Sequence, residues 1–193
     1  MSAINSALFG PGWQQKMGIG YQDLELPETG ERLTEESFQR LHASPEPRLV
    51  LIHLNPDEVV DAVIAHPLVM VASDGLPAHP RGAGTFARVL ARYVREQRRL
   101  TLMDALRKMS LMPAQRLERS TPAARDKGRL QEGADADVVV FDPQTIADRA
   151  TYRAPRQPSV GVRYLLVSGT VAVEDGKVVT GAAPGRALVG GSR

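Results

Sequence analysis

Residues 68–88 read LVMVASDGLPAHPRGAGTFAR, and the rest of the chain is interpreted around them. The apolar residues 68–72 end at Ser73-Asp74-Gly75, and a helix is expected from Gly84-Thr85 onward. A continuous apolar run bounded by turn residues predicts a strand buried on both faces, and a helix after it predicts an α/β unit. Because ligands collect at the carboxyl ends of strands in α/β folds, Asp74 is the first candidate for a functional residue.

The same order of elements precedes this stretch. Residues 48–54 (RLVLIHL) predict a buried strand, and Asn55 and Pro56 suit the cap and first position of the next helix. An earlier helix is expected over residues 34–42, where Thr34 precedes two glutamates. Strand, helix, strand, helix predicts a parallel sheet with right-handed crossovers.

The second half of the chain changes in texture. Three helices are expected, followed by short β runs, and Asp175-Gly176 suits a two-residue hairpin turn because both residues tolerate positive φ. The helices are expected at 84–98, 102–109 and 113–118, and the strands at 137–141, 162–167, 171–173 and 177–179. These patterns predict an α/β part over residues 1–125 and a small all-β part over residues 126–193.

The composition excludes several classes of function. The chain has 193 residues and a formal charge of +2, from 24 basic and 22 acidic residues, so a nucleic-acid partner is not expected. It has no cysteine, which excludes disulfides and cysteine-based zinc sites and fits a reducing compartment. No leader pattern or membrane-spanning apolar run is visible, so we predict a soluble cytoplasmic protein with no membrane partner.

Four blocks of sequence carry a family resemblance. They are SDG (73–75), HPRGAGTFARVL (79–90), ALRKMSLMPAQRL (105–117) and KGRLQEGADADVVVFDP (127–143). In this order they resemble the C-terminal part of the metal-dependent amidohydrolases, and they are most similar to the N-acyl-D-amino-acid deacylase (D-aminoacylase) branch. The resemblance implies an incomplete barrel: residues 1–125 would be the last strand-helix units of a TIM barrel, and residues 126–193 a β-sandwich portion.

The resemblance also implies a role for Asp74 as both a metal ligand and the group that transfers the proton of the attacking water. A carboxylate beside a divalent cation suits this chemistry, because it can accept that proton and return it to the leaving amine. Spacing alone favours another interpretation, in which Asp74 caps the turn that begins at Gly75.

The loop beyond Asp74 is expected to face the substrate. Arginine suits a bidentate contact with a carboxylate, and N-acyl amino acids carry a free one, so Arg81 is predicted to bind it. His79 is predicted to shape the pocket, and Gly75 is included among the substrate-binding residues. The alternatives are a solvated Arg81 and a His79 without a role in the site.

Most of the family's metal ligands are missing. The resemblance implies a complete centre made of a His-x-His pair, a Cys, Glu or modified Lys, two single histidines and the aspartate. The histidines of this chain are residues 42, 53, 66 and 79, and no two of them form such a pair. One carboxylate does not hold a catalytic zinc, which takes three or four protein ligands. We therefore expect zinc in the complete family enzyme and not in this chain alone. His53 is interpreted as a packed or supporting residue, and His42 and His66 as surface residues at helix ends.

The predicted function is metal-dependent hydrolysis of a C–N amide bond in an N-acyl-D-amino acid or a related amide, by a complete enzyme of which this chain is an inactive C-terminal portion. A complete barrel takes about 250 residues, more than this chain contains. One alternative is a non-catalytic binding or oligomerisation module that self-associates through unpaired strand edges at 48–54 and 68–72. Another is a truncated remnant of the enzyme.

Overall fold

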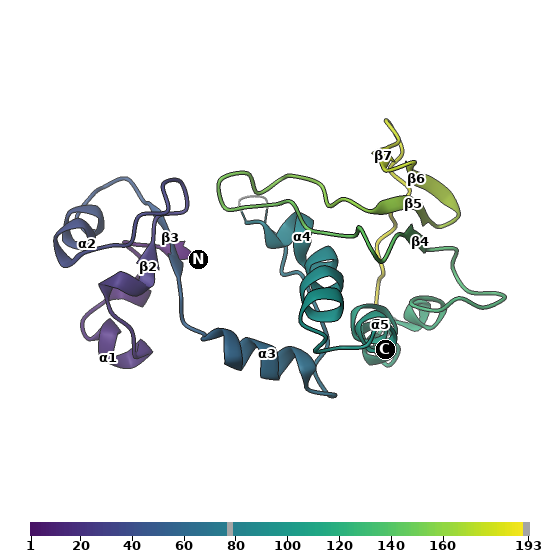
Figure 1. Cartoon of the computed structure of the whole chain (residues 1–193), viewed down its shortest axis with the longest axis horizontal. Coiled ribbons are helices and arrows are strands. Elements are labelled where there is room, and N and C mark those ends of the chain that lie inside the picture. The colour runs from purple at the N-terminus through teal and green to yellow at the C-terminus, as the bar shows by residue number, and fades with distance from the viewer. Residues whose placement is uncertain (77–78, 191–193) are drawn as a thin grey trace. The chain divides into compact units, whose positions relative to one another are not determined.

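The computed structural model describes residues 1–76 and 79–190, and the chain divides into two compact units, Met1–Val60 and Asp61–Arg193 (Figure 1). The division predicted at 125/126 within the second unit stays a prediction. Among the described residues, no helix has both the length and the apolar character needed to cross a membrane.

The first unit is a small antiparallel sheet with short helices. The strand order is β1-β3-β2, and both outer strands run antiparallel to β3. Its elements are β1 (Ser2–Ala3), η1 (Ala7–Phe9), α1 (Trp13–Met17), η2 (Tyr21–Asp23), β2 (Leu24–Glu25), α2 (Glu35–His42) and β3 (Leu49–Ile52), and α3 (Asp57–Ala65) leads out of it.

An aromatic cluster forms the core of this unit. Phe9, Trp13 and Phe38 are all at least 95% buried, and the rings of Trp13 and Phe38 stack with their centroids 5.3 Å apart. The predicted helix start is confirmed, because the Thr34 hydroxyl accepts a hydrogen bond from the Ser37 backbone N–H at 3.2 Å. The cap fixes α2, and α2 presents Phe38 to the cluster.

The predicted parallel sheet is wrong for this part of the chain. Strand β3 lies between two antiparallel partners, with Val50 opposite Ser2 and Ile52 opposite Leu24. Both of its edges therefore have partners, whereas the sequence predicted unpaired edges at 48–54. Residues 68–72 form no strand. They have no neighbouring strand to pair with among the described residues, and Leu68 is 80% exposed instead of buried.

Beyond the last residues of α3, the second unit contains two longer runs of helix. Helix α4 (Arg81–Arg88) continues into the π-helix η3 (Val89–Glu96), so the helix expected from Gly84 begins three residues earlier. The two helices expected after it form one run, in which Pro113 follows the wider turns of η4, a common site of helix irregularity. That run contains α5 (Leu102–Leu106), η4 (Arg107–Leu111) and α6 (Met112–Leu117), and η5 (Pro122–Asp126) follows it.

A four-stranded antiparallel sheet completes this unit, with the strand order β4-β5-β6-β7. The strands are β4 (Val138–Phe141), β5 (Val162–Val167), β6 (Thr170–Glu174) and β7 (Lys177–Val178), close to the predicted runs. The predicted hairpin turn is confirmed, since Asp175 and Gly176 both have positive φ, 46° and 77°. Only this one sheet is described in the unit, so a β-sandwich stays a prediction.

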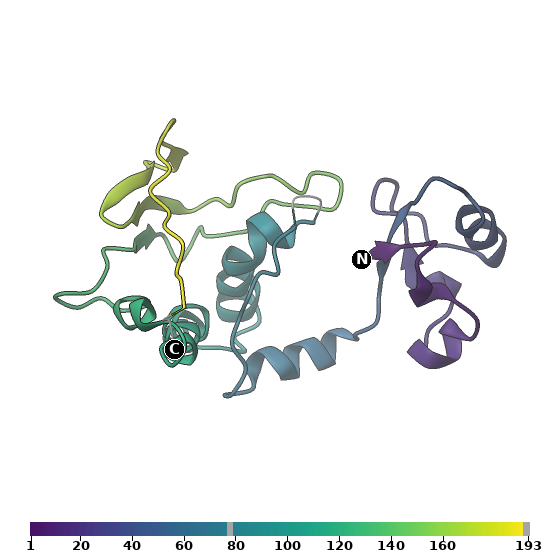
Figure 2. The ribbon, with the colours of Figure 1, turned by 180° about the vertical axis from the view of Figure 1, so that it is seen from behind.

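The connection between β4 and β5, residues 142–161, leaves the sheet. In Figures 1 and 2 it reaches from the sheet to the N-terminal end of α4, where the candidate site residues lie. This excursion brings residues of the predicted all-β part next to the segment HPRGAGTFAR (79–88).

Candidate functional site

Asp74 stands at an exposed turn between the irregular segment 66–72 and helix α4. Its side chain is 82% exposed, and its backbone has a φ of 46°, a left-handed conformation that aspartate tolerates better than most residues. The structure therefore presents this carboxylate to solvent at the turn where the sequence predicts a functional acid.

Arg81, the first residue of α4, holds Asp74 by two groups. Its Nη2 lies 2.8 Å from Asp74 Oδ2, and its Nε donates to the Asp74 carbonyl oxygen at 2.7 Å. A guanidinium has five N–H donors, so three lie outside these two contacts and can meet another anion. The expected pair of functional residues is thus brought together, with Arg81 oriented by Asp74.

His79 is the third predicted residue that the structure places here. Its Nδ1 accepts a hydrogen bond from the Arg81 backbone N–H at 3.1 Å, so Nδ1 carries no proton in this arrangement. Burial lowers the pKa of the His79 imidazole, and the Arg81 guanidinium lowers it further, against an opposing effect of Asp74. A neutral imidazole at neutral pH fits the acceptor role of Nδ1.

Tyr152 joins this group from the connection between β4 and β5. Its ring meets the His79 ring edge to face, with centroids 5.1 Å apart and an interplanar angle of 81°. The sequence did not identify Tyr152, because the two residues lie 73 positions apart and the intervening connection carries no regular pattern.

Glycines at the start of α4 permit close packing, which the sequence analysis did not predict. A Cβ at Gly82 would lie 2.9 Å from the Leu76 carbonyl oxygen, and one at Gly84 would lie 2.9 Å from the Asp148 Cβ. Both distances are shorter than a real side chain allows. Gly75, the predicted binding residue, has only ordinary contacts in place of a Cβ, so the steric need for glycine lies at 82 and 84.

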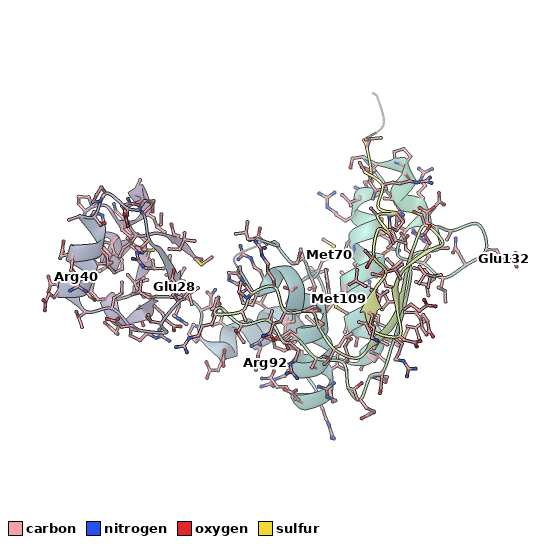
Figure 3. All side chains as sticks on the ribbon, turned by 90° about the horizontal axis from the view of Figure 1, so that it is seen from above. Glu28, Arg40, Met70, Arg92, Met109 and Glu132 are labelled. Carbon is pink, nitrogen blue, oxygen red and sulfur yellow. The ribbon has the colours of Figure 1, made fainter. Side chains whose placement is uncertain are left out.

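A buried lysine holds the segment that leads to Asp74. Lys108 in η4 is 3% exposed, its Nζ donates to the carbonyl oxygens of His66 and Val69, and its own carbonyl accepts from the Val71 N–H at 3.1 Å. Burial lowers the pKa of this ammonium group, and Asp104 opposes the effect. Figure 3 labels Met70, which lies between Val69 and Val71 in the sequence, and Met109, which follows Lys108.

The other histidines lie outside this group. His53 is exposed and its Nε2 lies 3.1 Å from Glu25 Oε2, so His53 is not packed, and a supporting role for it stays a prediction. His53 lies just after the end of β3, and its partner is the half-buried carboxylate of Glu25 in β2. His66 is exposed as expected, and His42 at the end of α2 stacks on Phe38, with centroids 5.4 Å apart.

The described residues do not fit a metal ion. Within residues 1–76 and 79–190, no three His, Cys, Asp or Glu side chains come together in a group that could hold one. The Asp74 carboxylate pairs with the cation of Arg81, which competes with a metal for it. The arrangement offers a carboxylate, a guanidinium with donors to spare and an imidazole, which together suit binding of an organic anion and proton transfer.

Comparison with known proteins identifies the family of the chain. Residues 29–173 match the model of the Amidohydrolase family. The chain is 48% identical over 114 residues to the N-acyl-D-glutamate deacylase of Alcaligenes xylosoxydans xylosoxydans, covering 57% of this chain and 22% of that protein. It is 40% identical over 136 residues to the N-acyl-D-aspartate deacylase of the same organism, covering 68% of this chain and 26% of that protein.

Solved structures give the same result. A D-aminoacylase crystal structure aligns with a TM-score of 0.68 and 34% identity, over 80% of this chain and 31% of that one. The N-acyl-D-glutamate deacylase of Bordetella bronchiseptica, in complex with zinc and a phosphonate inhibitor, aligns with a TM-score of 0.65 and 35% identity, over 87% and 38%. The chain spans about a quarter of the curated relatives it matches. By its sequence and its fold, it belongs to the amidohydrolase family.

Proposed function

We propose that this chain supplies the C-terminal part of the active site of an N-acyl-D-amino-acid deacylase, an enzyme that hydrolyses a C–N amide bond. The observation that supports the proposal is the compact group of Asp74, His79 and Arg81 at the start of α4. The names of the relatives give the substrate class: N-acyl-D-glutamate and N-acyl-D-aspartate are small molecules with a free α-carboxylate.

In this proposal the two charged residues have separate roles. Arg81 binds the substrate carboxylate with the guanidinium N–H groups that are not used on Asp74, in the fork geometry that suits a carboxylate. Asp74 accepts a proton from the attacking water and returns it to the leaving amine. We assign the proton to Oδ1, because Oδ2 already takes the Arg81 Nη2. His79 and Gly75 complete the loop that faces the substrate.

Zinc belongs to the complete enzyme in this proposal, and the chain alone is inactive. The described residues provide one of the expected ligands, Asp74, and no cluster that could hold the ion. The division of the chain at 125/126 into a barrel part and a β part, and a cytoplasmic location in keeping with the absence of cysteine, belong to the same proposal.

A specific observation also favours a second candidate function, a module that self-associates. Val139, Leu165, Val173 and Val178 are cross-strand partners in turn, so they form one apolar row on one face of the β4–β7 sheet. Val139 is 52% exposed and Val178 is 73% exposed. An exposed apolar row of this kind favours association with another polypeptide surface.

A chimera tests the proposed activity. Residues 29–173 would replace the matching segment of the Alcaligenes N-acyl-D-glutamate deacylase, and release of D-glutamate from N-acetyl-D-glutamate would be measured. We expect turnover in the chimera, a loss of about 10²–10⁴-fold in kcat with Asp74→Asn, and a raised KM with Arg81→Gln. A folded chimera whose Asp74→Asn variant keeps full activity would contradict the role of Asp74.

A further inference from the structure

We infer that Tyr152 is a positioning residue of the candidate site, which holds the His79 imidazole from the connection between β4 and β5. The inference rests on the proposed function for what the site binds, but its geometry can be tested without any activity. It assigns a role in the site to a residue outside the Asp74–Arg81 loop, 71 positions beyond Arg81 in the sequence.

The connection that carries Tyr152 is fastened to α4 on both sides of the tyrosine. Ser159 Oγ donates to the Ala83 carbonyl oxygen at 3.0 Å, and Arg88 Nη1 lies 3.3 Å from Asp148 Oδ2. Further along the helix run, the Arg95 Nη1 donates to the Ile146 carbonyl oxygen at 2.7 Å. Three attachments over one helix run give the connection a defined path past the start of α4.

Close packing at one glycine adds to these polar contacts. A Cβ at Gly84 would lie 2.9 Å from the Asp148 Cβ and 3.8 Å from the Ala150 Cβ. Only a glycine at this position lets the connection approach so closely. The motif HPRGAGTFAR therefore encodes both the Arg81 site and the surface on which the connection lies.

The contact passes from Tyr152 to Arg81 through one imidazole. The Tyr152 ring packs edge to face on His79, and the His79 Nδ1 accepts from the Arg81 N–H. Edge-to-face pairs of this separation are attractive and directional, so they restrict the rotation of the imidazole. A fixed imidazole in turn fixes the first N–H of α4, and with it the residue whose guanidinium holds Asp74.

Nuclear magnetic resonance of the full chain tests the geometry. We expect Tyr152→Ala to remove the ring-current shift of the His79 imidazole C–H signals, and Tyr152→Phe to retain it. Tyr164→Ala is the matched control, because Tyr164 lies in β5 and its hydroxyl contacts Asp175. Unchanged His79 signals in Tyr152→Ala would overturn the inference. If that variant does not fold, Tyr152→Leu decides in the same way, since it keeps the bulk and loses the ring.

A titration with N-acetyl-D-glutamate, followed on the guanidinium N–H signals of Arg81, tests the consequence for binding. We expect a saturable shift in the wild type and a several-fold weaker apparent affinity in Tyr152→Ala, with Tyr152→Phe close to the wild type. Equal affinities in all three proteins would overturn the positioning role. If the wild type itself gives no shift, the proposed binding role of Arg81 fails, and the His79 signals still decide the inference on Tyr152.

Discussion

The aromatic cluster of the first unit and the β4–β7 sheet of the second differ in how far they bury their apolar side chains. Phe9, Trp13 and Phe38 are at most 5% exposed, whereas no residue in the four strands of the sheet is buried. The residues of the cluster all come from the first 60 positions of the chain, and they bury one another. The sheet is held by its strand pairing and turns, so its apolar row stays open to another surface.

The largest effect should follow from opening the cluster. Trp13→Ala removes a 95% buried ring that contacts Phe9, Tyr21 and Phe38, and should lower the free energy of unfolding by about 3–5 kcal/mol. Urea unfolding followed by circular dichroism measures the change. Phe86→Ala is the control, because Phe86 is 47% exposed. Equal decreases in the free energy of unfolding of the two variants would mean that burial in the cluster does not contribute most of the stability.

A smaller and more local effect is expected at Lys108. Lys108→Met leaves the His66 and Val69 carbonyl groups without their charged donor, which should cost about 2 kcal/mol, because hydrogen bonds to charged groups are worth 1.5–3 kcal/mol. Amide hydrogen exchange should accelerate over residues 69–76. Lys127→Met is the matched control and should leave those amides unchanged. Slow exchange at 69–76 in Lys108→Met would show that other contacts hold the segment.

The stability of the β4–β7 sheet should depend on pH through the carboxylate of Asp137. Its pKa is lowered by the Lys127 ammonium and by the Ser168 backbone N–H, whose contact is 2.7 Å long. A lowered pKa in the folded state gives stability that is present above the unfolded pKa and is lost as pH falls through the folded value.

Asp137→Asn should therefore lower the free energy of unfolding by about 1–2 kcal/mol at pH 7, with the difference shrinking as the pH falls below about 4. Unfolding midpoints at a series of pH values measure this. A difference between the two proteins that stays constant down to pH 2 would contradict the assignment.

The smallest effect on stability is expected on the open row. Val178→Lys at a 73% exposed position should change the free energy of unfolding by less than about 0.5 kcal/mol. If the row mediates self-association, the same substitution should lower the mass measured by size-exclusion chromatography with light scattering. An oligomer that survives Val178→Lys and Val139→Lys would exclude this face as the contact.

The sequence predicted features that depend on neighbours along the chain. Thr34 capped its helix as expected, and Asp175-Gly176 made its turn, because caps and turns need only adjacent residues. Residues 68–72 failed as a strand because a buried strand needs partners, and the described chain holds that segment with Lys108 instead. A lysine that serves two carbonyl groups across 39 or more positions leaves no periodic signal.

The site shows the same division. Asp74, His79 and Arg81 were predicted together because they lie within eight residues of one motif, and the structure places them side by side. The direct contact of Arg81 with Asp74 was not expected, because the sequence assigned the two residues to different partners. Tyr152 was missed because only the path of the connection over α4 brings it to His79.

Zinc content and turnover of the purified 193-residue chain decide most directly whether it is an incomplete deacylase. After incubation with zinc and removal of the unbound ion, the protein would be assayed for metal and for amino acid released from N-acetyl-D-glutamate. We predict no stoichiometric zinc and no release, because the described residues bring no three metal-binding side chains together. One zinc per chain with turnover that Asp74→Asn abolishes would contradict this and would mean that the chain completes its own metal site.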